Sequence, residues 1–314
     1  MRMIDAQQVH AALDYPGLIE GLRLGHQQPV DDAASLILSH ETSPAANHFL
    51  VLPAWQHNRA MGVKIVTVFP ENLHTSASLP SVQAVYILCD GSNGQPIACI
   101  DGTALTYRKT AADSGLGSML LSRTDSRSLL MIGAGGLAPH VIQAHVAARP
   151  SIRRIQVWNR THARAEAVAD SLQLTGIDVT ATTDLEAAVR QSDVIACATN
   201  ATEPLVKGDL LQPGSHLDLI GSYTTDMHEA DQQAVVRASV FGDSHQRIVA
   251  DSGEIADALA SGAITTADII GDLYDLVQGR CRGRRSTDEI TLFKNAGGGH
   301  LDLMTARYLI EKLQ

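Results

Sequence analysis

Hydrophobic and polar residues follow two different arrangements along this chain, and the change at Ser128 divides it. Before Ser128, apolar residues at helical spacing predict an amphipathic helix over residues 4–24, capped by Asp5. Short apolar runs bounded by turn residues then predict strands, and Asp90-Gly91-Ser92-Asn93-Gly94 predicts a hairpin. The expected strands cover residues 49–52, 63–68, 82–89 and 96–101, and a helix is expected over 110–123.

After Ser128, apolar strands alternate with amphipathic helices, which is typical of βαβ units and a parallel sheet covered on both faces. A last helix is expected over residues 301–313, after Gly297-Gly298-Gly299. We therefore expect a domain of residues 123–292 inserted into a domain formed by residues 1–122 and 293–314. The expected strands cover residues 128–132, 154–158, 177–180, 194–198, 216–220 and 238–242, and the expected helices end at 148 and span 163–172.

Composition excludes several classes of protein. The 314 residues are 45% hydrophobic and 18% charged, which argues against disorder, and the chain can bury a large core without staples. A formal net charge of -10 disfavours binding to nucleic acid or anionic membranes. The four cysteines form no CxxC pair, so a structural zinc site is not expected. Neither a signal-peptide core nor a membrane-spanning stretch is evident, and we expect a cytoplasmic protein.

A glycine-rich turn connects the strand at 128–132 to the next helix. Gly133, Gly135 and Ala138 match G-x-G-x-x-G/A, with Gly136 and Leu137 inside the motif. In such a turn the first glycine allows the tight bend, and the second lets a pyrophosphate approach the backbone. The N–H groups and dipole of the following helix favour the bound anion. This turn therefore predicts a dinucleotide site.

The end of the second strand indicates which dinucleotide. NAD-binding sheets usually carry an acid there, whereas this strand continues as Asn159-Arg160-Thr161. Arg160 can pair with a 2′-phosphate, Asn159 and Thr161 can donate hydrogen bonds, and Arg164 lies one turn further on. We predict NADPH, with NADH the less favoured alternative. The expected fold is an α/β protein with a Rossmann-type NADP-binding domain inserted into an α+β dimerisation and substrate domain.

Several short motifs together resemble the ornithine cyclodeaminase/mu-crystallin family over nearly the whole chain. The resemblance implies a homodimer, whose first domain builds the dimer interface and half of the active site. Known activities of the family are ornithine cyclodeamination, alanine dehydrogenation and cyclic ketimine reduction, and mu-crystallin also binds thyroid hormone. The motifs are Gly62-Val63-Lys64, Leu79-Pro80-Ser81-Val82-Gln83, Asp101-Gly102, Lys109-Thr110-Ala111-Ala112, the turn at Gly133, Asn159-Arg160-Thr161, Ser252-Gly253-Glu254 and Leu292-Phe293-Lys294-Asn295-Ala296-Gly297.

Lys64 matches the family's lysine. A lone lysine in an apolar strand is costly to bury without a partner, and it can supply a cation for a carboxylate or a proton. The family's second cation falls on Lys109, with Arg108 beside it, and both stay candidates. The resemblance also implies cofactor contacts from Ser81, Gln83, Lys109, Thr199, Gly221, Ser222 and Asn295.

Two departures from the family pattern narrow the function. Tyr223 stands where cyclodeaminases carry an aspartate, which weakens cyclodeamination, whereas Asp226 and Glu229 align with the mu-crystallin pattern. The arginine expected upstream of Lys64 is missing. His40 and Glu41 lie in that region, and the later His48 is a candidate for binding the substrate carboxylate.

These residues favour an NADPH-dependent reductase of cyclic ketimine 2-carboxylates. Δ1-Pyrroline-2-carboxylate would give L-proline, and Δ1-piperideine-2-carboxylate would give L-pipecolate. The proton donor would be Lys64, a water or His48, while His300 either lines the pocket or only begins the last helix. The alternatives are ornithine cyclodeaminase, a non-catalytic mu-crystallin-like NADPH-binding protein and alanine dehydrogenase. Neither nucleic acid nor a membrane is an expected partner.

Overall fold

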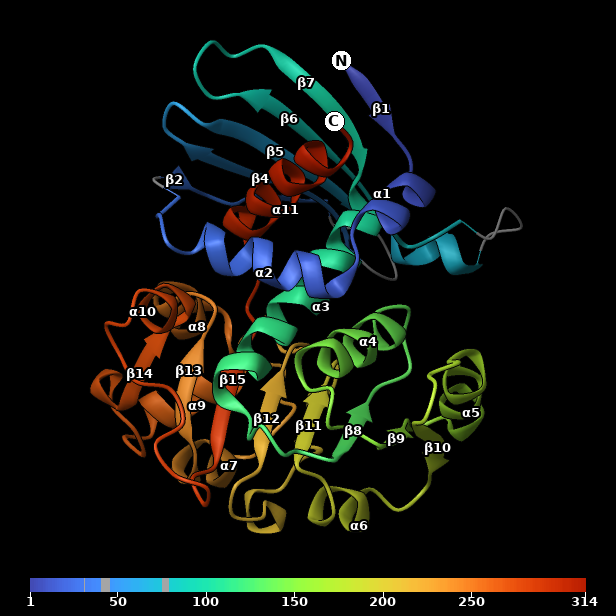
Figure 1. The fold of residues 1–314 in the computed structure, drawn as a ribbon, viewed down its shortest axis with the longest axis vertical. Helices are drawn as coiled ribbons and strands as arrows, with labels where there is room; N and C mark the ends of the chain where they lie inside the picture. The colour runs from blue at the N-terminus through green and yellow to red at the C-terminus, as the bar shows by residue number, and fades with distance from the viewer. Residues whose placement is uncertain (31, 41–45, 75–78) are drawn as a thin grey trace. The chain divides into compact units, whose positions relative to one another are not determined.

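The computed structural model describes residues 1–30, 32–40, 46–74 and 79–314, which form two compact units. The first comprises Met1–Lys109 with Gly298–Gln314, and the second Thr110–Gly297 (Figure 1). The sequence led us to expect boundaries between residues 122 and 123 and between residues 292 and 293, and the boundaries of these two units differ from them. Strand β15 (Thr291–Lys294) belongs to the second unit's sheet, and a Cβ on Gly117 of α3 (Gly102–Leu121) would lie 2.6 Å from Phe293 of that strand. Much of α3 therefore packs with the second unit.

The first unit contains a seven-stranded sheet in the order β1-β7-β6-β5-β4-β2, with β3 paired to β4. Only β1 is parallel to its neighbour among these described pairs. The expected hairpin joins β6 and β7, and Gly94 in its turn has a positive φ of 77°. The strands are β1 (Arg2–Ile4), β2 (Asp32–Ala33), β3 (Leu36–His40), β4 (Asn47–Gln56), β5 (Ala60–Val68), β6 (Val82–Asp90) and β7 (Pro96–Asp101).

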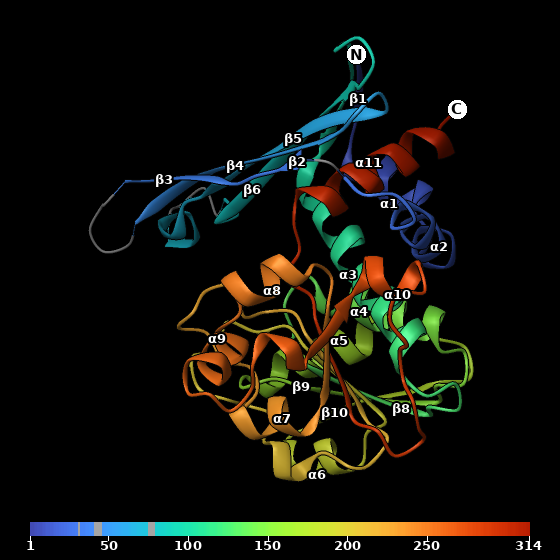
Figure 2. The same cartoon turned by 90° about the vertical axis from the view of Figure 1, so that its left-hand side faces the viewer.

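Three helices lie on one side of this sheet, α1 (Ala6–Ala12), α2 (Tyr15–Gly25) and α11 (Gly299–Lys312) (Figure 2). The single helix expected over 4–24 was wrong. Asp5 does cap α1, but Asp14 starts a second helix by accepting a hydrogen bond from the Gly17 N–H at 2.8 Å. A second cap inside an otherwise continuous apolar stripe therefore breaks the helix.

The second unit contains an eight-stranded parallel sheet in the order β10-β9-β8-β11-β12-β15-β13-β14. This sheet confirms the expected α/β class. The chain leaves β8 toward β9 and later returns to β11 on the other side, so the strand order reverses between β8 and β11. The strands are β8 (Ser128–Ile132), β9 (Arg154–Trp158), β10 (Asp178–Thr182), β11 (Val194–Cys197), β12 (His216–Leu219), β13 (Ser239–Gly242), β14 (Ile269–Asp272) and β15.

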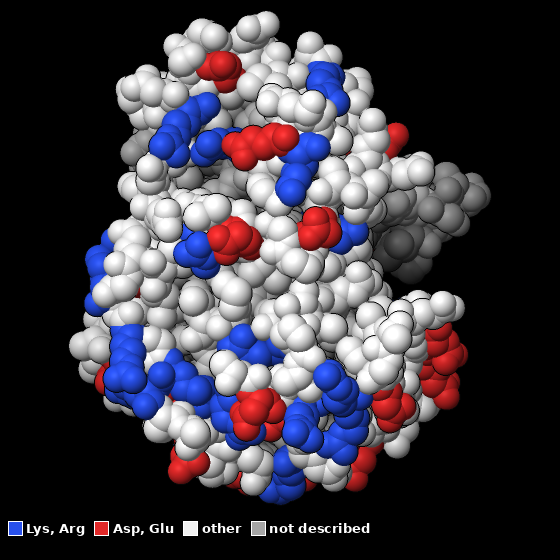
Figure 3. All heavy atoms as spheres, viewed as in Figure 1, with Lys and Arg blue, Asp and Glu red and all other residues white. Residues whose placement is uncertain are grey.

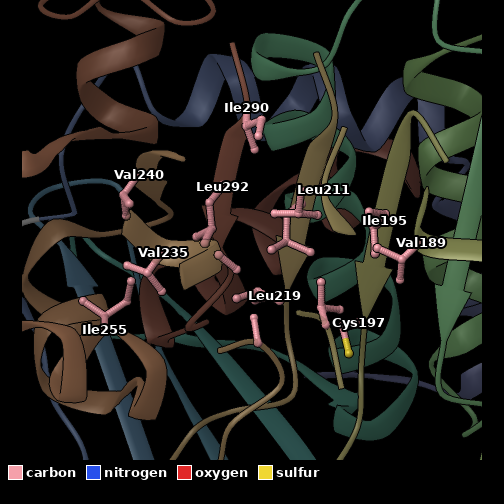
Figure 4. Close-up of a cluster of buried hydrophobic side chains, with 14 of the residues drawn as sticks. Val189, Ile195, Cys197, Leu211, Leu219, Val235, Val240, Ile255, Ile290 and Leu292 are labelled. Carbon is pink, nitrogen blue, oxygen red and sulfur yellow. The ribbon is translucent and has the colours of Figure 1, made fainter. Parts of the chain in front are cut away.

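Buried aliphatic side chains fill the space on one face of this sheet (Figure 4). Strand residues such as Ile195 and Leu292 meet helix residues such as Val235 and Ile255 there. Cys197 lies in the same cluster, and burial raises its pKa well above the ordinary thiol value, as expected for an inert thiol. The helices are α4 (Ala138–Ala148), α5 (His162–Ser171), α6 (Leu185–Arg190), α7 (Gln232–Arg237), α8 (His245–Asp251), α9 (Gly253–Ala260) and α10 (Leu273–Val277).

Charge is compensated locally over the second unit. Lys and Arg side chains gather there with Asp and Glu between them on the face shown in Figure 3. Arg123 lies 3.0 Å from Asp125 and 3.3 Å from Asp193, and Lys207 lies 2.7 Å from Glu186. Within the described parts of the chain, no helix is long and apolar enough to cross a membrane.

Candidate functional site

The glycine turn follows β8 and is shaped by its neighbours. Gly133 has a φ of 106°, and a Cβ there would lie 2.4 Å from the Ala198 carbonyl oxygen, so only glycine fits. A Cβ on Gly135 would meet nothing within 4 Å, which leaves the backbone open to a ligand. Ala138 is buried at the start of α4, and Pro139 lies in its first turn. Each position has the geometry that a dinucleotide turn requires.

The edge of the sheet at this turn fits an anionic ligand. Among the hydrogen bonds of the described residues, none uses the N–H groups of Gly135 or Gly136. Those groups lie before the N-terminus of α4, whose dipole favours negative charge. Thr199 follows β11, so the turn and Thr199 flank the reversal of strand order, where ligands bind in open α/β sheets. These residues could hold the pyrophosphate of a nicotinamide dinucleotide.

The loop after β9 presents basic and polar groups. Arg160, Thr161 and Arg164 are exposed, and the Asn159 side chain donates a 3.0 Å hydrogen bond to the Thr161 carbonyl oxygen. Thr161 occupies the N-cap of α5, but its side chain makes no capping hydrogen bond. The loop therefore leaves two guanidinium groups and a hydroxyl accessible to a phosphate.

The loops after β11 and β12 meet at a buried carboxylate. Glu229 accepts hydrogen bonds from the N–H groups of Thr199 at 2.6 Å and of Gly221 at 2.6 Å. Burial raises the pKa of Glu229 to about 7, although the Lys294 ammonium acts to lower it. The sequence shows Glu229 only as a match to a family pattern, because its hydrogen-bond partners are 30 and 8 residues away.

Two predicted cofactor residues are used within the protein. Ser222 is buried, and its hydroxyl donates to the Met227 carbonyl oxygen at 2.7 Å. The Asn295 amide donates to the Thr110 carbonyl oxygen at 2.9 Å and to the Ser114 hydroxyl at 3.0 Å. These side chains fix the ends of their strands, and their contact with a cofactor stays a prediction.

In the first unit, Lys64 points from β5 toward α11 and is paired there. Its Nζ lies 3.0 Å from Oδ1 and 2.8 Å from Oδ2 of Asp302, while Lys64 is only 6% exposed and Asp302 is fully buried. A partner for this lysine was expected from the cost of burying an unpaired charge. Its identity was missed, although Asp302 is the one acid in the apolar stretch from Leu301 to Ala306.

Tyr86 completes this buried cluster. It pairs with Lys64 across the β5–β6 ladder. Its hydroxyl oxygen packs against Gly62, where an added Cβ would lie only 2.2 Å from it. Burial, reinforced by the negative charge of Asp302, raises the pKa of Tyr86 well above its ordinary value. Tyr86 is therefore held in its neutral form beside the Lys64–Asp302 ion pair.

Two other predicted substrate-binding residues, Arg108 and Lys109, are engaged elsewhere in their own contacts or buried. The Arg108 guanidinium donates to His10 Nδ1 and to the His10 carbonyl oxygen, both at 3.0 Å, and lies 4.8 Å from the Tyr15 ring centroid. Lys109 is buried and already engaged within the protein. Both residues lie on α3, so this stretch is helical rather than extended.

His48 lies further along the sheet. It pairs with Val68, which is four residues beyond Lys64, or about 13 Å along the strand. Its Nδ1 is 2.9 Å from the Ser39 hydroxyl.

The remaining predicted residues of this unit differ in exposure. Gln83 is exposed and Ser81 is half-buried. His300 is buried at the start of α11, with its ring centroid 6.1 Å from that of His26. Of the alternatives weighed near His48, His40 is exposed and Glu41 lies outside the described residues.

No group of three or more potential metal ligands among the described His, Cys, Asp and Glu residues could hold a metal ion. The site residues described above are instead an open glycine turn with a basic loop in the second unit, and a buried lysine–aspartate pair in the first.

Comparison with known proteins gives a consistent result. The ornithine cyclodeaminase/mu-crystallin family model matches residues 20–314. Protein SAR DEFICIENT 4 of Arabidopsis thaliana is 40% identical, covering 98% of this chain and 96% of the relative. A Δ1-pyrroline-2-carboxylate reductase of Paracoccus denitrificans is 41% identical, covering 95% and 92%. The Thermococcus litoralis Δ1-pyrroline-2-carboxylate reductase, solved in complex with NADH and L-proline, superposes with a TM-score of 0.90 at 29% identity, covering 99% and 97%.

The lysine–aspartate pair predicts a non-additive pattern of stability. Lys64→Met or Asp302→Leu alone should lower the free energy of unfolding by about 3–5 kcal/mol, because each leaves one buried charge unpaired. The double variant should lose much less than the sum of the two. Chemical denaturation of the four proteins measures this cycle, and additive losses would show that the two charges do not depend on each other.

Proposed function

This chain belongs to the ornithine cyclodeaminase/mu-crystallin family, and from that premise we propose that it is an NADPH-dependent ketimine reductase. It would reduce Δ1-pyrroline-2-carboxylate to L-proline, Δ1-piperideine-2-carboxylate to L-pipecolate, or both. The observation that carries the proposal is similarity along nearly the whole chain to relatives named Δ1-pyrroline-2-carboxylate reductase, one of them solved with NADH and L-proline.

Reduction of a cyclic imine requires a hydride at carbon and a proton at nitrogen, and a bound nicotinamide supplies the hydride. The protein has to bind the substrate carboxylate and hold the imine in position. A lysine ammonium has three donors, so Lys64 keeps donor capacity beyond its contacts with Asp302. We assign Lys64 to the carboxylate or to the transferred proton, with a water or His48 as other proton donors.

The second cation is better assigned to Lys109 than to Arg108. The Arg108 fork already serves His10 and stacks on Tyr15, and moving it would break those contacts. Lys109 matches the family position directly, although it lacks the bidentate geometry of an arginine.

The alternatives are weaker on the residues present. Tyr223, which is 59% exposed, replaces the aspartate expected of a cyclodeaminase. Against a non-catalytic NADPH-binding protein stands the presence of Lys64, which can serve the substrate carboxylate or the transferred proton. Alanine dehydrogenase is distinguished by its substrates rather than by these residues.

Turnover tests the reductase directly. Purified protein with Δ1-pyrroline-2-carboxylate should consume NADPH, and Lys64→Ala should lower kcat by about a hundredfold or more because a positioned cation and proton donor is lost. NADPH binding, followed by nicotinamide fluorescence, should change by less than about twofold. Proline and ammonia from ornithine would instead identify a cyclodeaminase, and consumption of pyruvate with ammonia an alanine dehydrogenase. Binding without any turnover would identify a carrier.

The preference for NADPH over NADH is proposed from the loop after β9. Arg160→Ala should raise KM for NADPH about tenfold to a hundredfold, because a charge-assisted contact to the 2′-phosphate is lost, and should leave KM for NADH nearly unchanged. Arg154→Ala is the matched control, since Arg154 is exposed at the opposite end of the same strand. Equal effects of Arg160→Ala on both cofactors would contradict the assignment.

We propose further that the chain forms a homodimer through the face of the first unit's sheet that its own helices leave uncovered. Large apolar side chains are exposed along this face, including Leu36 at 53%, Leu38 at 56%, Phe49 at 40% and Trp55 at 42%. Such a patch is unusual on a monomer and is typical of an interface between subunits.

Phe49→Glu with Trp55→Glu should convert the dimer to a monomer in analytical ultracentrifugation, because two charges would be buried at the contact. Leu24→Glu serves as the control, since Leu24 is exposed at 50% on α2 rather than on the sheet. A wild-type protein that sediments as a monomer at micromolar concentration would refute the homodimer.

A further inference from the structure

Glu229 uses both of its carboxylate oxygens to join two loops. Oε1 accepts from the Thr199 N–H at 2.6 Å and from the Thr199 hydroxyl at 3.1 Å. Oε2 accepts from the N–H groups of Ile220 at 3.0 Å and Gly221 at 2.6 Å. Thr199 follows β11 and Ile220 follows β12, which are neighbours in the parallel sheet. One fully buried side chain therefore fixes the relative position of two adjacent strand ends.

The two loops touch at this point. A Cβ on Gly221 would lie 2.0 Å from the Thr199 carbonyl oxygen and 2.6 Å from Glu229 Oε1. Backbone thus packs directly on backbone, with the carboxylate beside the contact. Removing the carboxylate would leave the N–H groups of Thr199 and Gly221 and the Thr199 hydroxyl without their acceptor, whereas the Ile220 N–H keeps its bond to the Cys197 carbonyl oxygen. The loops could relieve this loss by moving apart.

Glu229 is itself held by two other buried charged residues. Glu254 Oε1 accepts from the Glu229 N–H at 2.7 Å, and the Ser252 hydroxyl donates to Glu254 Oε2 at 2.9 Å. Lys294, at the end of β15 beside β12, is fully buried, and its positive charge acts on Glu229. Lys294 Nζ has no hydrogen-bond partner within the described part of the chain, so its charge acts on the Glu229 carboxylate through space.

We propose that Glu229 is a positioning residue for the nicotinamide dinucleotide, holding the loops after β11 and β12 in the arrangement that receives it. The inference rests on the proposed function, because it assumes that a dinucleotide binds at this edge. Glu229 does not touch the ligand in this assignment, since its oxygens are occupied by the loops. It acts through the backbone of Thr199 and Gly221.

Glu229→Gln tests the proposal with little change in size. Glutamine offers one acceptor oxygen, and its NH2 group would face N–H donors where the second oxygen had been. The dissociation constant for NADPH, from nicotinamide fluorescence well below the unfolding temperature, should rise about tenfold. KM for the imine should change less than about twofold. Glu229→Asp keeps the charge but is too short to reach both loops, so it should bind NADPH with intermediate affinity.

Asp193→Asn is the matched control. The Asp193 carboxylate accepts from the N–H groups of Arg127 at 2.7 Å and Ser128 at 3.0 Å. It therefore also joins two neighbouring strands of the same sheet, β8 and β11, but at their amino ends. Both substitutions should lower the unfolding temperature, and only those at Glu229 should weaken NADPH binding.

The outcomes separate the two hypotheses. If the unaltered protein binds NADPH and both Glu229 variants bind it equally well, the positioning role is wrong while the proposed function stands. The same conclusion follows if Asp193→Asn weakens binding as much as Glu229→Gln, since the loss would then be general. Should Glu229→Gln fail to fold, the affinity of Glu229→Asp relative to Asp193→Asn decides. An unaltered protein that binds neither NADPH nor NADH would overturn the proposed function and the inference together.

Discussion

A charged group buried inside a protein needs an opposite charge or hydrogen-bond partners, and each unit of this chain meets that requirement at one buried charged residue. Lys64 lies within a buried strand face, where an isolated ammonium would be prohibitively unfavourable, and Asp302 compensates it from the last helix. In the second unit, Glu229 is matched by backbone N–H groups and by the nearby Lys294. Both arrangements join segments that are distant in sequence.

At the carboxyl edge of the parallel sheet, the loops that follow neighbouring strands pack against one another. Gly133 lacks a side chain because the Ala198 carbonyl lies against it, and Gly221 because the Thr199 carbonyl does. The loops after β8, β11 and β12 therefore contact one another in turn. A rigid set of backbone groups is what a dinucleotide needs from a protein that leaves the chemistry to the cofactor. Glycine here serves close packing between loops as much as approach to a ligand.

The loop after β12 carries both Tyr223, where the family resemblance predicts an aspartate in cyclodeaminases, and Glu229, which joins this loop to the loop after β11. Tyr223 is exposed within it, while Glu229 at its far end is fully buried. The exposed part of such a loop can change chemistry without disturbing the buried part, because the backbone is fixed by Glu229. This division offers a physical reason why one scaffold can support several activities, as function depends on the site and not on the fold.

The sequence by itself determined the elements whose signals are local. Strands β8 and β9 and helix α4 begin or end where apolar runs meet glycine, proline or polar turn residues, and the glycine turn between β8 and α4 could be found from Gly133, Gly135 and Ala138. Strands β14 and β15 were not predicted, although β11, β12 and β13 have the same length of four residues and were. The tertiary structure alone decided the partners of buried charges: Asp302 lies 238 residues from Lys64, and Glu229 lies 30 residues from Thr199. Spacing along the chain carries no information about such pairs, since they form only when packing removes water from both groups.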